Sequence, residues 1–192
     1  MRAPYWALFL ACFSILGAVG VAAQERSPTA AGLWQQIDGG TGQSEGWFLI
    51  YEKNGLYEGA IAKIFPKPGD APNPTCPKCE GEQRNAPLLG LTFIKRMQRN
   101  GLKYLDGTIL DPRDGSVYTA LMEVSPDGQK LTVRGYLGIA LFGKNQIWHR
   151  LPDAALAQVD RAVIAAHAPA LLPAAAGRPA ASPVQQRAPA AR

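Results

Sequence analysis

Residues 100–138 read NGLKYLDGTILDPRDGSVYTALMEVSPDGQKLTVRGYLG. Three dipeptides divide this stretch at regular intervals: Asn100-Gly101, Asp114-Gly115 and Asp127-Gly128. Asn-Gly and Asp-Gly supply the positive φ angles that tight β-turns require. About ten residues lie between successive turns, which is the length of a strand. The stretch therefore predicts a meander of antiparallel strands.

Between the turns, apolar and polar side chains alternate. In residues 130–137, Leu131, Val133 and Leu137 share one parity and the residues between them are largely polar. Such a period of two is typical of strands with one buried face. Two further turn signals, Asn54-Gly55 and Gly143-Lys144, extend the pattern in both directions. We expect strands at 32–38, 46–53, 55–65, 89–99, 101–111, 115–125, 129–138 and 145–151.

Eight sequential antiparallel strands predict an all-β fold, an up-and-down barrel over residues 32–151. A β-sandwich is the alternative. Short sequential hairpins favour the barrel, because a sandwich needs crossing connections.

The N-terminus predicts an exported protein. Arg2 is followed by an apolar run from Tyr5 to Val21 and by small residues ending at Ala23, which indicates a signal peptide over 1–23. Residues 24–31 are then a linker. An uncleaved membrane anchor and lipid attachment at Cys12 are alternatives. With the leader removed, we expect a periplasmic or secreted protein without an integral membrane span.

The C-terminal 41 residues, 152–192, form an Ala- and Pro-rich tail with 16 Ala and 6 Pro. Residues 153–168 are expected to form one helix that begins after Pro152, with Leu156, Val159 and Val163 on one face. Beyond Pro169 the composition predicts disorder, because few large apolar groups are present.

Charge argues against nucleic acid as a partner. The chain carries a net charge of +5, but residues 32–151 contain 14 Lys or Arg against 12 Asp or Glu, a net of +2. The excess is spread over the leader and tail, so no compact basic patch is predicted.

Two cysteines stand in the stretch PTCPKCEG, residues 74–81. Cys76 and Cys79 lie in a Pro-rich connection, 66–88, between the third and fourth strands. In an oxidising compartment such a pair predicts a disulfide. Redox activity, with Lys78 assisting a thiolate, and a metal site are alternatives. A zinc site needs about four ligands and the remaining candidates are His149 and His167, so we predict neither a metal nor a cofactor.

Several motifs in order resemble domain-of-unknown-function family 2147 (DUF2147), a set of secreted bacterial proteins without an established activity. They are Gly32-Leu33-Trp34, Cys76-Pro77-Lys78-Cys79-Glu80-Gly81, Pro87-Leu88-Leu89-Gly90-Leu91, residues 111–118, residues 131–136 and Trp148-His149-Arg150. The first and last of these are also similar to lipocalins and their calycin relatives. That resemblance implies a barrel whose closed end is sealed by Trp34 and Arg150.

No catalytic residue is predicted. His149 lies on a strand with no Ser-His-acid arrangement recognisable, and Asp111 and Asp114 fit a turn. The candidate contacts for a small, partly apolar ligand or an envelope partner are Arg113, Tyr118, Arg134, Tyr136 and Trp148. We therefore expect a binding protein rather than an enzyme. An envelope redox factor using Cys76 and Cys79, and a structural adaptor with a filled barrel, are the alternatives.

Overall fold

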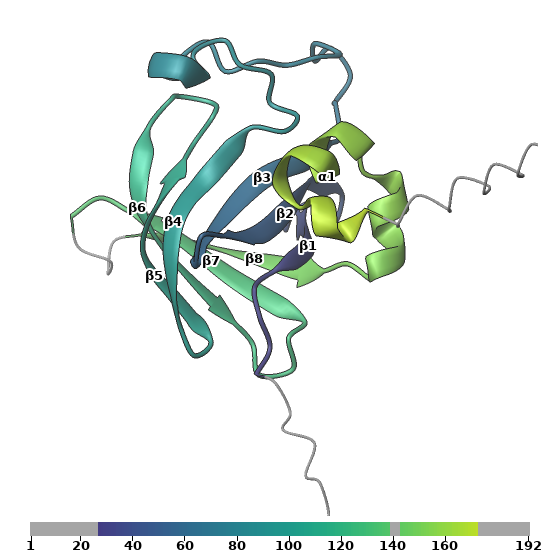
Figure 1. Cartoon of the computed structure of the whole chain (residues 1–192). Coiled ribbons are helices and arrows are strands. Elements are labelled where there is room, and N and C mark those ends of the chain that lie inside the picture. The colour runs from purple at the N-terminus through teal and green to yellow at the C-terminus, as the bar shows by residue number, and fades with distance from the viewer. Residues whose placement is uncertain (1–26, 139–142, 173–192) are drawn as a thin grey trace, which may run out of the picture.

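The chain folds as a closed barrel of eight antiparallel strands in sequence order, so the expected all-β up-and-down barrel is confirmed (Figure 1). The computed structural model describes residues 27–138 and 143–172. Each strand pairs with the next, and β8 pairs with β1 to complete the ring. The strands are β1 (Gly32–Ile37), β2 (Ser44–Lys53), β3 (Leu56–Ile64), β4 (Thr92–Asn100), β5 (Lys103–Leu110), β6 (Val117–Val124), β7 (Lys130–Tyr136) and β8 (Lys144–Arg150).

All eight expected strands are present, and the largest difference in their bounds is at the start of β4. This strand begins at Thr92 rather than at residue 89. The backbone N–H of Gly90 donates to the Ile61 carbonyl, and that of Leu91 to the Leu88 carbonyl, which makes residues 88–91 a turn. The long connection after β3 therefore ends three residues later than the apolar pattern suggests.

Large side chains from the inward-facing positions pack inside the barrel. Because successive residues of a strand point to opposite faces, each strand sends every second residue to the interior. Among the fully buried ones are Trp34, Met97, Tyr104, Met122 and Trp148.

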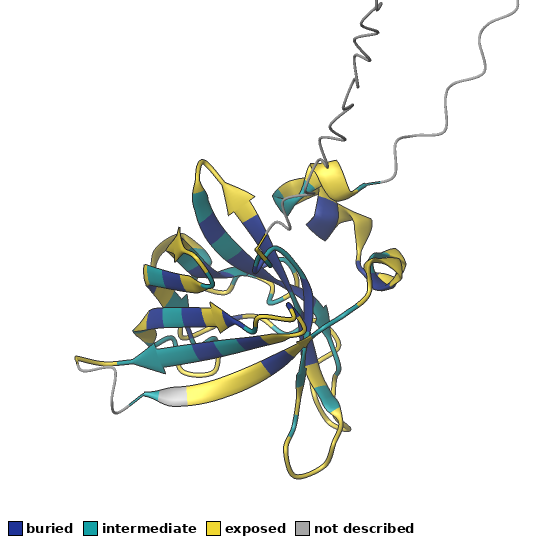
Figure 2. Ribbon diagram, turned by 90° about the horizontal axis from the view of Figure 1, so that it is seen from below, coloured by how far each residue is buried: buried dark blue, intermediate teal, exposed yellow. Residues whose placement is uncertain are grey.

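A second apolar cluster covers the outer face of β1, β2 and β3. From the barrel it takes Leu33, Trp47, Leu49, Tyr51, Ala60 and Ala62. Residues 153–172, which we call the C-terminal arm, supply Ala155, Val159, Val163 and Ile164. Figure 1 shows the arm on the outside of the barrel beside β1–β3, and Figure 2 shows that parts of it are buried. Strand β2 is thus buried on both faces along much of its length.

The arm corrects two expectations about the tail. The single helix expected over 153–168 is instead a 3-10 helix, η3 (Asp153–Gln158), followed by the α-helix α1 (Arg161–His167). The break arises because Asp160 caps α1, its side chain accepting from the Ala162 N–H at 2.8 Å, a role that Asp favours. Beyond Pro169, where we expected disorder, η4 (Pro169–Leu171) is formed and Leu172 packs on the second cluster.

The expected linker also differs in part. Residues 27–31 are described and close the base of the barrel, as shown below. The expected signal peptide, residues 24–26 and the tail from 173 onward lie outside the described residues. Within the described ranges, no helix has the length and apolar character needed to cross a membrane.

Candidate functional site

Arg150 and Trp34 seal the base of the barrel. They are directly paired between β1 and β8, and the Arg150 guanidinium lies 4.2 Å from the centre of the Trp34 ring. The same guanidinium donates to three backbone carbonyls, those of Thr29, Ala31 and Gly128. Burial lowers the pKa of Arg150, but arginine stays charged in proteins. One cation therefore joins the N-terminal segment to the last strand and to the β6–β7 turn.

Residue 30 is anchored from both sides at this base. The Trp34 indole N–H donates to the Ala30 carbonyl at 2.7 Å, and the Ala30 N–H donates to the Tyr104 hydroxyl at 2.7 Å. Gly32 permits the approach of Arg150, because a Cβ at this position would lie 2.5 Å from Nη1 of Arg150, and its φ of +133° is one that other residues rarely adopt. This end of the barrel is structural.

The opposite end is covered by residues 66–88, the Pro/Cys loop (Figure 1). Cys76 and Cys79 form a disulfide with 5.4 Å between their Cα atoms, and both residues are almost completely buried. The Cys76 sulfur lies 3.3 Å from the Pro112 carbonyl oxygen on the β5–β6 turn. A Cβ on Gly115 of that turn would lie only 2.0 Å from the Lys78 carbonyl oxygen. The disulfide is thus part of the core, inaccessible to a partner thiol.

The five candidate ligand contacts do not form one surface. Trp148 is fully buried in an aromatic cluster, with its ring centre 4.3 Å from that of Phe48. Tyr118 points to the interior, close to Gly135. Arg134 and Tyr136 have the parity opposite to the buried positions of β7 and lie outside, where Arg134 donates to Asn145 at 2.7 Å.

Arg113 lies at the exposed tip of the β5–β6 turn and is engaged within it. Its guanidinium donates to both carboxylate oxygens of Asp111, at 2.6 to 3.2 Å. These hydrogen bonds hold the pKa of Asp111 below its ordinary value. The pair stabilises the turn, which fits the interpretation of Asp111 and Asp114 as turn residues.

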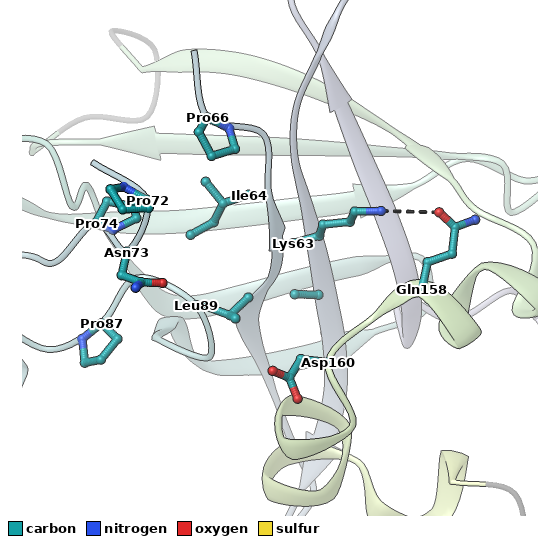
Figure 3. Close-up of a pocket in the computed structure, with 11 residues that line it drawn as sticks. Lys63, Ile64, Pro66, Pro72, Asn73, Pro74, Pro87, Leu89, Gln158 and Asp160 are labelled. Atoms are coloured by element: carbon teal, nitrogen blue, oxygen red, sulfur yellow. Dashed lines mark hydrogen bonds between the residues drawn. The ribbon is translucent and has the colours of Figure 1, made fainter. Parts of the chain in front are cut away.

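The described residues do form two adjoining pockets, both outside the barrel, between the Pro/Cys loop and the C-terminal arm. Their volumes are about 270 and 510 Å³, and they share Pro87, Leu89 and Asp160 in their walls. We call them together the loop–arm groove. Figure 3 shows the smaller pocket, with Ile64, Leu89 and prolines of the loop on one side and Gln158 and Asp160 on the other.

The polar groups of the groove come from separate elements. Lys63 of β3 donates to the Gln158 side chain at 3.2 Å, and its ammonium lies 4.3 Å above the Trp47 ring. Asp160 of the arm and Asn73 of the loop complete the smaller pocket. The larger pocket is lined by Glu82 and His167 among mainly apolar neighbours. The groove therefore combines apolar walls with a few groups of both charges, which suits a small amphipathic molecule.

Within residues 27–138 and 143–172, no group of three or more His, Cys, Asp or Glu side chains is placed to hold a metal ion. His149 is exposed on β8, whereas His167 is half-buried in the arm.

A closed eight-stranded up-and-down barrel, with an indole and a guanidinium stacked at its base, is a lipocalin-like fold. The chain belongs to the family DUF2147, described as "Uncharacterized protein conserved in bacteria", which matches residues 32–150. This confirms the resemblance found in the sequence motifs.

A solved structure with a similar fold is protein HP1028 from the human pathogen Helicobacter pylori, described as belonging to the lipocalin family. The two are 18% identical, with a TM-score of 0.59 over 70% of this chain and 92% of that one. The likeness concerns the fold. Comparison with curated protein sequences gives no match.

Proposed function

We propose that the protein is an exported binding protein of the bacterial envelope, which holds a small, partly apolar ligand in the loop–arm groove. The observation that carries this proposal is the contrast between the two sides of the barrel wall. Large aromatic and aliphatic side chains pack in the interior, while the described pockets lie outside. The groove thus offers a ligand room outside the barrel wall.

Binding accounts for the cysteines better than thiol exchange does. Exchange needs an exposed sulfur that an attacking thiolate can reach. Cys76 and Cys79 are 0% and 2% exposed, and they pack on the β5–β6 turn. The disulfide shapes the loop that forms one wall of the groove.

A location outside the cytoplasm is part of the proposal. It is supported by the leader-like residues 1–23 and by the disulfide, since such bonds persist mainly in oxidising compartments.

The groove is tested with the fluorescent probe 8-anilinonaphthalene-1-sulfonate, whose apolar rings and anionic group match the walls and Lys63. Leu89→Asp places a charge at the junction of the two pockets and should weaken probe binding at least about tenfold, since a desolvated charge costs several kcal/mol. Ile37→Asp is the matched control, because Ile37 is 40% exposed and Leu89 is 41% exposed, and Ile37 does not line the groove.

Both variants are first checked for an unchanged circular dichroism spectrum and melting temperature. Probe binding that is equally affected by both substitutions, or unaffected by Leu89→Asp, would reject the groove as the site. Native mass spectrometry of the purified protein then identifies the natural ligand by its mass, and loss of that mass in Leu89→Asp alone places it in the groove.

A further inference from the structure

His167, near the far end of the C-terminal arm, makes polar contacts with the barrel in addition to the apolar packing of the arm. The Nε2 atom of His167 lies 2.9 Å from the Gly90 carbonyl oxygen, and its Nδ1 atom lies 3.1 Å from the Tyr51 hydroxyl. The Tyr51 hydroxyl in turn lies 2.9 Å from Oε2 of Glu58, its partner across β2 and β3. A chain of three polar contacts thus runs from the 88–91 turn before β4 through the arm and β2 to β3.

These three contacts need three protons, one between each pair of heavy atoms. The Gly90 carbonyl only accepts, so Nε2 of His167 carries a proton. Burial raises the pKa of Tyr51 to about 12, so the phenol keeps its single proton at neutral pH. A neutral imidazole and a phenol supply two protons in total. The third must lie either on Nδ1 of His167 or on Glu58.

The Tyr51 hydroxyl can donate to Glu58 or to His167, and both arrangements require the same number of protons. If Tyr51 donates to Glu58, both ring nitrogens of His167 are protonated. If Tyr51 donates to Nδ1, Glu58 must be protonated in order to donate to the phenol oxygen. The Thr92 hydroxyl, 3.3 Å from that of Tyr51, adds a neutral partner and does not change the count. The docked arm therefore holds one proton more than neutral histidine and ionised glutamate.

The charged groups near His167 come from several elements. On β2, Lys53 lies 3.9 Å from Glu58, but its side chain is 62% exposed and its charge is screened by solvent. Glu58 on β3 is 19% exposed. Glu82 of the Pro/Cys loop and Asp160 of the arm line the same pocket as His167, and β4 contributes the neutral Thr92. Glu82 and Asp160 thus share a pocket with the histidine, and the Asp160 carboxylate accepts from the Ala162 N–H at the other end of α1.

We propose that the C-terminal arm is a proton-dependent cover, which docks through His167, Tyr51 and Glu58 with uptake of one proton and is released as the pH rises. Release exposes the apolar outer face of β1–β3, including Trp47 and Leu49. The inference goes beyond the proposed ligand site and does not rest on it, because it follows from the proton count alone.

The sign and the pH window follow from linkage. A free histidine titrates near pH 6.5, so above this pH the released arm has lost a proton that the docked arm still holds. The docking equilibrium constant should fall by up to about tenfold per pH unit above 6.5, because one proton is taken up on docking. Below that value the released arm is protonated as well, and the dependence levels off.

Amide hydrogen exchange of the full chain measures docking directly. The reporters are the helical N–H groups of Val163, Ile164 and Ala168, whose acceptors lie within the arm. After correction for the intrinsic pH dependence of exchange, their protection should fall by up to about tenfold per unit between pH 6.5 and 8.5. Protection that does not change with pH would overturn the proposal.

The chain's two histidines provide a matched pair of variants. His167→Gln should abolish the pH dependence, while His149→Gln, at an exposed position on β8, should keep it. An unchanged slope in His167→Gln would refute the role of this residue.

If His167→Gln leaves the arm undocked at every pH, the proposal is tested instead on the unsubstituted protein, by measuring the protonation of His167 and Glu58 with nuclear magnetic resonance. At pH 7 with the arm protected, either both ring nitrogens of His167 or the carboxyl of Glu58 must be protonated. A neutral imidazole together with an ionised Glu58 would overturn the proposal.

Discussion

Replacing Arg150 tests the closure of the barrel base most directly. Its guanidinium donates to three carbonyls and lies on the Trp34 ring. A hydrogen bond from a charged group is worth about 1.5–3 kcal/mol when fully buried, and half-burial reduces this to about 1 kcal/mol each. The cation–π contact adds about 1 kcal/mol. Arg150→Ala should therefore lower the free energy of unfolding by about 4 kcal/mol, a large share of the 5–15 kcal/mol typical of domains.

Arg150→Lys should cost less, about 2–3 kcal/mol, because an ammonium keeps the charge but cannot span three carbonyls as a planar fork does. Urea unfolding followed by tryptophan fluorescence gives the values, with the m-value expected to stay constant. Arg161→Ala is the control, since Arg161 is exposed on α1 and should change the free energy by less than about 0.5 kcal/mol. A loss below about 1 kcal/mol for Arg150→Ala, or equal losses for Ala and Lys, would refute the reasoning.

Three further predictions concern the other end of the barrel. Gly115→Ala should destabilise the protein by at least about 2 kcal/mol more than Gly69→Ala. Both glycines have a positive φ, but only a Cβ at position 115 would meet the Lys78 backbone. Equal melting temperatures of the two variants would contradict this prediction. Replacing both Cys76 and Cys79 with Ala should lower the free energy of unfolding by about 2 kcal/mol, which is what the chain-entropy model gives for a ring of four residues. Urea unfolding of this variant should remain cooperative. A variant that is unfolded in buffer would contradict this and show that the disulfide supports the whole barrel. Arg113→Gln should raise the pKa of Asp111 toward its ordinary value in a carboxyl titration by nuclear magnetic resonance, because hydrogen bonds from Arg113 lower that pKa. The stability that the ion pair adds to the turn is present above about pH 3.9 and is lost as the pH falls through the lowered pKa of Asp111. An unchanged pKa of Asp111 in the variant would contradict the role of Arg113.

The barrel could be predicted from the sequence because its determinants are local. Asn-Gly and Asp-Gly fix the turns, and the alternation around Leu131 and Val133 fixes which side of β7 is buried. The sealing pair could be anticipated from Gly32-x-Trp34 and Arg150, since a resemblance to lipocalins places these at the two ends of the strand order.

The position of the groove could not be predicted in the same way. Trp47, Leu49 and Tyr51 are buried on the outer face of β2 by a segment 100 or more residues later, and the alternation rule does not say what covers that face. The arm's alanine-rich composition suggested an appendage, although Leu156, Val159 and Val163 did carry the signal of an apolar face. The break at Asp160 was visible only as a helix-capping residue within an otherwise helical pattern.

The candidate contacts do not lie on one surface, for a geometric reason. Tyr118 on β6 and Arg134 on β7 are both at even positions, yet one faces inward and the other outward. Which parity faces inward is set strand by strand, through the turn lengths and the register of pairing. Without that register, aromatic and basic residues on neighbouring strands cannot be assigned to one surface.

The closure of the base also governs when the protein can become folded as the chain emerges from the ribosome. Arg150 holds the carbonyls of Ala31 and Thr29, which precede it by 119 and 121 residues. Contacts between such distant positions form late and slow folding. Until Arg150 has emerged, β1 lacks β8 as its second neighbour, so the barrel stays open.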